Sequence, residues 1–267
     1  MATTRHLSRI IGPDGRTVIL ALDAPAFATD IAGVDRAVHA VPQMVSHGLD
    51  CVLVPKGIAL RASSYLQDVG MVLRCDTVTD IYDGSIPGTF IVNDALDAVQ
   101  VGADGVVVMA FPGHDAHPEL QQQTTDLYKG CRKYRLPLIV EALPFTFVGA
   151  NEAHRDPKNV AVAVRLAAEL GADIVKTRYS GTPEDAVIAA DATVPVVALG
   201  GPKAGLDGYL EFVRHCIAAG AAGVAVGRNI VQDPHPVAKV AALGAIVHGD
   251  STVAQALALY EDVAATD

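Results

Sequence analysis

The chain alternates between short apolar runs and longer segments of mixed polarity. The runs are rich in Val, Ile and Leu and do not alternate strictly with polar residues, which is typical of parallel strands covered on both faces. Eight runs fit this description: Val18–Leu22, Cys51–Val54, Met71–Leu73, Val106–Met109, Leu138–Val140, Ile174–Val175, Val196–Leu199 and Val224–Val226. The pattern therefore predicts eight buried strands.

The segments between these runs carry the signals of helices. Asp156-Pro157 combines an N-cap residue with a first-turn proline and predicts a helix that runs to Gly171, and Thr182-Pro183 repeats that start signal. A last helix is expected from Ser251 to about Val263. A further helix is predicted by one apolar stripe at the spacing i, i+3, i+4, i+7, i+8, formed by Tyr209, Phe212, Val213, Cys216 and Ile217.

A joint between helix and strand recurs four times along the chain. Each copy places a glycine, suited to the left-handed cap that ends a helix, three or four residues before an apolar run. The four copies are His47–Val52, Val101–Val106, Leu170–Val175 and Ala219–Val224. This repetition predicts regular alternation of helix and strand.

Length and composition select among the folds that such alternation allows. The chain has 267 residues, of which 51% are hydrophobic and 19% charged, with no Pro/Ser-rich linker. We predict a single α/β domain over residues 1–267, a TIM (β/α)8 barrel with a short extension at 1–15 and a terminal helix at 251–263. An open doubly wound sheet is the alternative.

Charge and cysteine spacing narrow the classes of partner. The net charge of −10 makes nucleic acid or an anionic membrane an unfavourable partner. Cys51, Cys75, Cys131 and Cys216 lie far apart, which argues against a zinc site or disulfides and favours a reducing cytoplasm. No apolar run reaches the length of a membrane span, and the amino-terminal residues lack a signal-peptide core. We expect a cytoplasmic protein with no metal and no cofactor.

Candidate chemistry lies where barrel strands end, because loops at the carboxyl ends of strands build the active face of this fold. Lys176 is the most informative residue, because it follows the apolar strand Ala-Asp-Ile-Val. A dry pocket disfavours the charged ammonium, and a neutral amine can attack a carbonyl carbon to form an imine. The alternative is a lysine that reaches from the strand end to pair with a loop carboxylate.

The last two strands end in glycines beside cations. Gly200-Gly201 is followed by Lys203, and Gly227 is followed by Arg228. Bare backbone N–H groups and nearby cations suit an anion, and barrels often bind phosphate at these two loops. The alternative is that the glycines only form tight turns and Arg228 caps a helix.

Other polar residues near strand ends rank lower. Asp23, Lys56 and Glu141 follow the first, second and fifth strands, and Glu141 is either a proton-transfer group or an ion-pair partner of Lys176 or Lys56. The long connection Ala110–Pro137, expected to contain a helix, adds His114 and His117.

Four segments resemble the class I aldolases of the DeoC/FbaB family, the archaeal, DhnA-type fructose-bisphosphate aldolases. The segments are Val18–Asp23, Gly171–Gly181, Gly200–Lys203 and Ala219–Asn229. The resemblance implies a TIM-barrel Schiff-base enzyme, a homo-oligomer, acting on a phosphorylated keto substrate and an aldehyde. It implies that Lys176 forms the imine, that Asp23 belongs to the active site, and that the Gly200-Gly201 and Gly227-Arg228 turns hold phosphate.

Two departures from the family change the expected chemistry. Relatives usually carry histidine and glycine after the first-strand aspartate, where this chain has Ala24-Pro25, and many carry a proton-transferring tyrosine where this chain has Leu143. Leucine cannot move a proton, so Glu141, Asp23, Tyr179 or a loop histidine must do so. Tyr179 is alternatively a half-buried ring near the rim of the barrel.

The leading hypothesis is a metal-independent class I aldolase. A second keeps the imine but changes the reaction, as in relatives that make an amino-keto sugar phosphate or transfer an acyl group from a phosphorylated dione. A third is a non-catalytic barrel that binds a phosphorylated metabolite. The connection Ala110–Pro137 and the segment Thr77–Gly88 are expected to set the choice of substrate.

Overall fold

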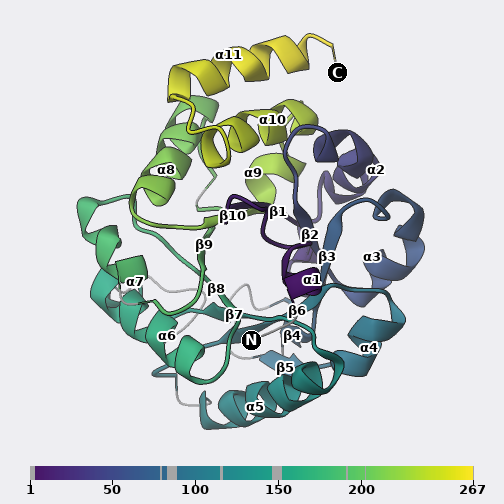
Figure 1. The fold of residues 1–267 in the computed structure, drawn as a ribbon, viewed down its shortest axis with the longest axis vertical. Coiled ribbons are helices and arrows are strands. Elements are labelled where there is room, and N and C mark those ends of the chain that lie inside the picture. The colour runs from purple at the N-terminus through teal and green to yellow at the C-terminus, as the bar shows by residue number, and fades with distance from the viewer. Residues whose placement is uncertain are drawn as a thin grey trace.

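Eight parallel strands close into a barrel in the computed structural model, which describes residues 4–78, 80–82, 89–114, 117–145, 152–190, 192–201 and 203–266, without the side chains of residues 4 and 117–121. The order around the barrel is β1-β10-β9-β8-β7-β6-β3-β2 (Figure 1). The strands are β1 Thr17–Ala21, β2 Cys51–Val54, β3 Gly70–Arg74, β6 Gly105–Ala110, β7 Leu138–Ala142, β8 Ile174–Thr177, β9 Val196–Leu199 and β10 Gly223–Val226. The predicted (β/α)8 barrel is confirmed, and the open doubly wound sheet is wrong.

Helices surround the barrel, and α11 lies outermost, against α10 (Figure 1). The helices are α1 Thr4–Leu7, α2 Val34–Val45, α3 Lys56–Arg61, α4 Ala95–Gln100, α5 His117–Tyr134, α6 Pro157–Glu169, α7 Ala186–Ala190, α8 Leu206–Ala218, α9 Arg228–Val231, α10 Pro236–Val247 and α11 Val253–Ala264. Short 3-10 turns are η1 Ala24–Ala26, η2 Ser63–Tyr65, η3 Glu152–His154 and η4 Pro183–Asp185. Of the helices in these ranges, none has the length and apolarity to cross a bilayer.

The local signals in the sequence act as expected in most places. Asp156 caps α6 by accepting from the N–H of Lys158 at 3.0 Å. Thr182 makes no side-chain cap and begins only the turn η4, which leads into the short α7. The glycines of the four repeated joints have φ of 94°, 75°, 103° and 95°, the left-handed region that favours glycine; they are Gly48, Gly102, Gly171 and Gly220.

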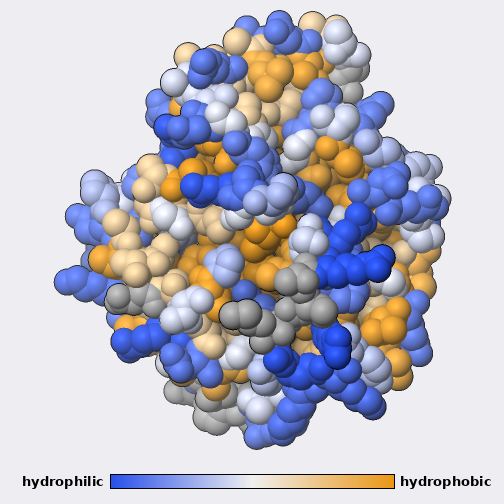
Figure 2. All heavy atoms as spheres, in the orientation of Figure 1, coloured by the Kyte–Doolittle hydropathy of each residue, from blue (hydrophilic) through white to orange (hydrophobic). Residues whose placement is uncertain are grey.

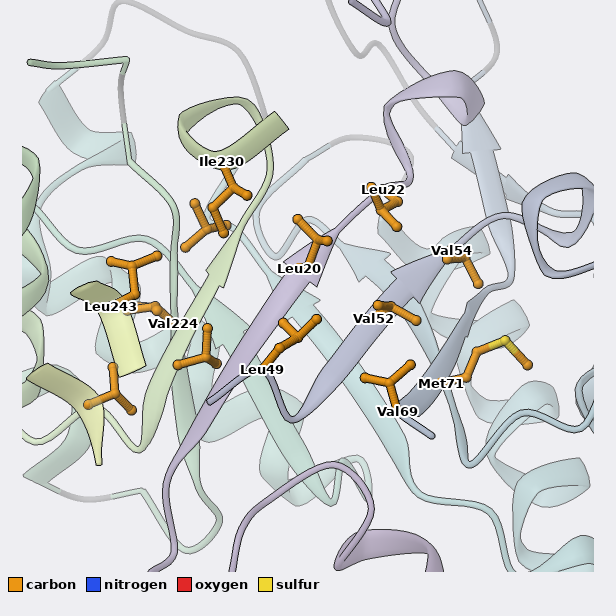
Figure 3. Close-up of a cluster of buried hydrophobic side chains, with 14 of the residues drawn as sticks. Leu20, Leu22, Leu49, Val52, Val54, Val69, Met71, Val224, Ile230 and Leu243 are labelled. Atoms are coloured by element: carbon orange, nitrogen blue, oxygen red, sulfur yellow. The ribbon is translucent and has the colours of Figure 1, made fainter. Parts of the chain in front are cut away.

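Two apolar layers hold the barrel in place. Alternate strand residues such as Ile19, Leu53 and Val107 fill the interior of the barrel. The residues between them face outward and pack against helices; Figure 3 shows members of this outer layer on β1, β2 and β10, with Leu243 of α10. On the face shown in Figure 2, hydrophilic side chains cover much of the outer edge of the molecule, and apolar patches lie between them and toward the centre. The strands are therefore buried on both faces, as their composition predicts.

The amino-terminal segment closes one end of the barrel. Ile10 and Ile11 pack into the interior layer, and Thr17 Oγ1 donates to the carbonyl oxygen of Ile10 at 2.6 Å. A Cβ at Gly70 would lie 1.7 Å from the carbonyl oxygen of Arg9, so the backbone of β3 and this segment meet without a side chain between them. Only the opposite end, where the strands have their carboxyl ends, is left for a site.

A two-stranded antiparallel sheet, absent from our sequence-based expectations, follows β3. It pairs β4 Asp76–Val78 with β5 Thr89–Ile91. Thr77 Oγ1 donates to the carbonyl oxygen of Ala26 at 2.5 Å, so this sheet also contacts the loop after β1. Of the segment Thr77–Gly88, residue 79 and residues 83–88 lie outside the described part of the chain.

The terminal helices are tied to the closed end of the barrel by an ion-pair triad whose strength depends on pH. His248 Nδ1 lies 2.7 Å from Asp14 Oδ2, and its Nε2 lies 3.0 Å from Asp50 Oδ2. The hydrogen bond to Asp50, aided by Asp14, raises the pKa of His248 to about 9 against the opposing effect of burial. We therefore expect His248→Asn to lower the free energy of unfolding by about 1–2 kcal/mol where the imidazole is charged.

The pH dependence of that loss identifies its cause. A raised pKa stabilises the fold fully below the unfolded value near 6.5, and this contribution disappears as pH rises through about 9. Urea unfolding at pH 6 and pH 9.5 measures both limits, with His39→Asn, an exposed histidine, as the matched control. An equal loss at both pH values would show that packing, not charge, is responsible.

Candidate active site

At the open end of the barrel, several strands place charged residues facing inward, in contrast to the apolar layer below them. Side chains along a strand alternate between faces, so the position two residues beyond an interior apolar residue also faces inward. Arg74 follows Val72 in this way, Glu141 follows Ile139, and Lys176 follows Ile174. Asp23, just beyond β1, joins them. Charged side chains on β3, β7 and β8 and just beyond β1 therefore meet at one point.

Lys176 lies inside the barrel mouth and not on its solvent-exposed rim. It is a neighbour of Glu141 in the register of β7 and β8, and its Nζ lies 2.9 Å from Glu141 Oε2. Lys176 is only 4% exposed. Lys56 instead pairs with Asp97 of α4 at 2.6 Å, partly exposed. Of the two pairings considered for Glu141, the structure contains the one with Lys176.

Arg74, which the sequence analysis did not single out, occupies the centre of the cluster. Its Nε and Nη2 donate to Asp23 Oδ2 at 3.0 and 2.7 Å. Nη2 also donates to Glu141 Oε2 at 2.6 Å, and Nη1 donates to Asp76 Oδ1 at 3.2 Å. One guanidinium therefore bridges carboxylates on β4, on β7 and just beyond β1. Its signal in the sequence was a single arginine at the end of an apolar run, between Leu73 and Cys75.

Burial and charge compete in setting the protonation of the cluster. Burial alone would raise the pKa of Glu141, but the adjacent Lys176 and Arg74 lower it to about 2. Burial would lower the pKa of Arg74, but Asp23, Glu141 and Asp76 raise it well above its usual value. Burial raises the pKa of Asp76 in spite of Arg74. Glu141 is consequently a carboxylate and Arg74 a cation at any ordinary pH.

Two carboxylates in the cluster keep an oxygen for other partners. Asp23 uses Oδ2 for both bonds to Arg74, and Glu141 uses Oε2 for both Arg74 and Lys176. Within the described residues, Oδ1 of Asp23 and Oε1 of Glu141 accept no hydrogen bond. A carboxylate oxygen in this state can accept a proton or bind a substrate hydroxyl.

Tyr179 does not join this cluster. Its ring belongs to the outer apolar layer, and its hydroxyl is buried with no hydrogen-bond partner in the described part of the chain. Burial, together with Cys216 of α8 and Asp185, raises the pKa of Tyr179 well above its usual value. A phenol in this position faces a helix and not Lys176, so of the proton-transfer candidates the geometry favours the carboxylates.

An apolar cluster lies beside the charged one. Leu143, where relatives often have tyrosine, packs against Val78, Met109 and Phe111. The guanidinium carbon of Arg74 lies 5.5 Å from the ring centroid of Phe27, which also packs on this cluster. These side chains keep water from the ion pairs, which strengthens them.

The loops after β9 and β10 are joined by a residue that the sequence analysis missed. Asn229, buried in α9, donates from Nδ2 to the carbonyl oxygen of Gly200 at 2.9 Å, and its Oδ1 accepts from the N–H of Ala204 at 3.3 Å. Gly201 has φ of 65°, and a Cβ there would lie 2.9 Å from the ring of Phe212. Asn229 therefore joins the two turns. Gly201 is required by its backbone conformation and by the nearby Phe212 ring, in addition to its expected role in binding an anion.

The cations of these loops are exposed. Lys203 donates from Nζ to Gln232 Oε1 at 3.1 Å, and Arg228 forms no hydrogen bond or ion pair with any described residue. Gly227 precedes α9, so its turn and Arg228 lie directly after β10. The structure thus brings Gly200, Lys203 and Arg228 to adjoining loops.

The remaining candidates are two histidines in the connection after β6. His114 lies beside Phe111, with ring centroids 6.5 Å apart, and the side chain of His117 is not described. No group of three or more histidine, cysteine or acidic residues suited to a metal ion occurs in the described ranges.

Comparison with known proteins relates this site to enzymes. The family model described as DeoC/LacD family aldolase matches residues 17–233. A 2-amino-3,7-dideoxy-D-threo-hept-6-ulosonate synthase of Halobacterium salinarum is 33% identical, covering 96% of this chain and 95% of its own. A class 1 fructose-bisphosphate aldolase of the same species is 33% identical, covering 92% and 96%.

A solved structure extends the comparison to three dimensions. An archaeal fructose-1,6-bisphosphate aldolase, with its catalytic lysine covalently bound to the carbinolamine intermediate of the substrate, superposes with a TM-score of 0.81. It is 30% identical and covers 92% of this chain and 99% of its own.

The ion pairs at Glu141 make a prediction about stability. Glu141→Gln leaves Lys176 buried without its charged partner and removes one of the three carboxylates around Arg74, so we expect the free energy of unfolding at pH 7 to fall by about 3–5 kcal/mol. Because the pKa of Glu141 is lowered, its contribution is present above about pH 4.5 and is lost as pH falls toward 2. Urea unfolding should show a smaller difference in the free energy of unfolding between wild type and variant at pH 3 than at pH 7. The same difference at both pH values would contradict the prediction.

Proposed function

The chain belongs to the DeoC/LacD aldolase family, and we propose that it makes or cleaves a C–C bond in a phosphorylated ketose or related keto phosphate through an imine on Lys176. It is a lyase of the class I aldolase type. The observation that carries the assignment of Lys176 is its position: a nearly fully buried amine at the carboxyl end of β8, 2.9 Å from a carboxylate.

The reaction begins with the neutral amine of Lys176. Its nitrogen attacks the keto carbon, the carbonyl oxygen takes a proton, and the resulting carbinolamine loses water to give an iminium ion. The iminium withdraws electrons from the adjacent C–C bond, whose cleavage releases an aldehyde and leaves an enamine. Protonation of the enamine and addition of water return the amine. The same steps in reverse join an aldehyde to the keto phosphate.

The carboxylates beside Lys176 supply proton transfer and charge. Glu141 touches Nζ, so it is placed to stabilise the iminium and to exchange protons with the departing water through Oε1. Asp23, across Arg74 from Glu141, has Oδ1 available to take the proton of the substrate hydroxyl as the C–C bond breaks. Glu141 and Asp23 together take the proton-transfer role of the tyrosine that many relatives carry where this chain has Leu143.

The turns after β9 and β10 form the proposed phosphate site. Gly200, Gly201 and Gly227 bring bare backbone close to an anion, and Lys203 and Arg228 add positive charge. Asn229 supports this role by fixing one turn against the other. The phosphate would then lie on the side of the mouth formed by the last two strands, beside Lys176 on β8.

A changed reaction is the second candidate, since a 2-amino-3,7-dideoxy-D-threo-hept-6-ulosonate synthase and a class 1 fructose-bisphosphate aldolase are each 33% identical to this chain. Leu143 favours it, because loss of a tyrosine alters which proton transfers are possible. Product analysis with free coenzyme A, aspartate semialdehyde and simple aldehydes separates a synthase, a thiolase-like acyl transferase and an aldolase.

We also propose a cytoplasmic homo-oligomer. All four cysteines are free and buried, as a reducing compartment allows. Apolar side chains are exposed on α3, α4 and β5, where a second copy would cover them: Leu60, Leu96, Val99 and Phe90.

Borohydride trapping tests the imine. Reduction in the presence of a keto phosphate should attach the substrate to Lys176, identified by peptide mass spectrometry. Lys239 is the matched control, because it is equally buried, at 2% exposure, and lies 3.1 Å from Asp233, yet packs against helices away from the mouth. Labelling of Lys239 or of no lysine during turnover would refute the proposal.

Variants of the two exposed cations test the phosphate site. Arg228→Ala and Lys203→Ala should each raise KM for a phosphorylated substrate by about tenfold or more, with a smaller change in kcat, because a charge-assisted contact contributes about 1.5–3 kcal/mol. Inorganic phosphate should compete with substrate in wild type and less in the variants.

The non-catalytic alternative makes the opposite prediction. If Lys176→Met preserves biological activity while Arg228→Ala abolishes it, the barrel binds a phosphorylated metabolite without reacting with it.

A further inference from the structure

We propose that Arg74 is a positioning residue for the chemistry at Lys176, acting by fixing the two carboxylates on which proton transfer depends. This inference rests on the proposed imine and deepens it. Arg74 is 1% exposed and each nitrogen of its guanidinium donates to a carboxylate, so it acts through Asp23 and Glu141 and not by touching substrate.

The geometry of the guanidinium sets the orientation of both carboxylates. Nη2 donates to Asp23 Oδ2 at 2.7 Å and to Glu141 Oε2 at 2.6 Å, so one nitrogen joins them. Each carboxylate is bound through one oxygen, which directs its other oxygen away from Arg74. A planar guanidinium imposes this arrangement because its donors point in fixed directions, whereas an ammonium group can rotate.

The far side of the guanidinium is also held in place. Nη1 donates to Asp76 Oδ1 at 3.2 Å, and Asp76 Oδ2 accepts from the backbone N–H of Met109 at 3.0 Å. The Phe27 ring lies against the guanidinium carbon. Arg74 is therefore fixed relative to β4, β6 and the loop after β1. Because Asp23 and Glu141 are bound to Arg74, their carboxylates are held in fixed positions as well.

Arg74 also sets the charge around Glu141. Arg74 and Lys176 both touch this carboxylate, and Arg178 acts on it electrostatically. Arg74 also shares Glu141 Oε2 with Lys176, which weakens the hold of Glu141 on the ammonium and helps to keep Glu141 ionised.

Two substitutions separate charge from geometry. Arg74→Met removes both, and we expect kcat/KM to fall by roughly 100-fold or more, mostly in kcat, since Arg74 lies outside the proposed phosphate site. The acidic limb of its pH profile should move to higher pH, because Glu141 loses a cation that lowers its pKa. Arg74→Lys keeps the positive charge but loses the planar guanidinium with its fixed donors. Its pH profile should therefore remain near that of wild type, while its kcat is at least tenfold lower than that of wild type.

Controls identify a loss that is only structural. Arg214→Ala, which removes a surface ion pair with Asp250, should leave rate and pH profile unchanged. Circular dichroism and thermal unfolding establish that each variant is folded; if Arg74→Met does not fold, Arg74→Lys carries the test. Low millimolar guanidinium should partly restore the rate of Arg74→Ala and not that of Lys176→Met.

The outcomes are distinct from those of the proposed function. If wild type traps substrate on Lys176 but folded Arg74→Lys and Arg74→Met keep the wild-type kcat and pH profile within about twofold, the role of Arg74 is wrong and the imine stands. If wild type traps no substrate, the proposed function fails first.

Discussion

Burying charge inside an apolar barrel is favourable only where opposite charges and hydrogen bonds compensate it, and the open end of this barrel meets that requirement through Arg74. Its guanidinium contacts Asp23, Asp76 and Glu141, and Glu141 in turn contacts Lys176. Removing Arg74 takes the ion-pair partner from Asp23 and Asp76, and removing Glu141 takes it from Lys176. The position of the Lys176 amine is therefore a property of the whole cluster and not of β8 alone.

The barrel divides structural and chemical work between its layers. Inward-facing residues are apolar through the middle of the strands, and on β3, β7 and β8 the next inward-facing residue is charged. The residues between them face outward and bind the helices, so the chemistry can vary without disturbing the outer core. Leu143 illustrates this freedom, because it sits among Met109, Phe111 and Val78 without touching the outer layer.

Much of this arrangement could be predicted from the sequence because it depends on local pattern. Short Val-rich runs and recurrent glycine caps identify strands and joints, and Lys176 stands out because it ends such a run. Arg74 ends one too, but a single arginine there is indistinguishable from a rim residue until the partners on β1 and β7 are known. The strands β4 and β5 have three residues each, too few to show a period.

Tyr179 lies outside the charged cluster because its side chain points away from it, a direction that the sequence analysis did not establish. Its place in sequence, three residues after Lys176, gives it the opposite face from the lysine, and the turn beyond β8 keeps it against α8. The exposed cations Lys203 and Arg228 were placed more reliably, since a glycine turn at a strand end fixes which end of the barrel they occupy. Side-chain direction, and not element type, was the harder property to infer.

The segment that closes the opposite end of the barrel has a consequence for biosynthesis. Ile10 packs toward Gly105 on β6, and Arg16 donates to the carbonyl oxygen of Ala221, next to β10. These partners lie roughly 90 and 200 residues later in the chain. Residues 10–16 are synthesised before these partners, so they reach their final contacts only after Ala221 has been added, and their docking marks the completion of the closed barrel.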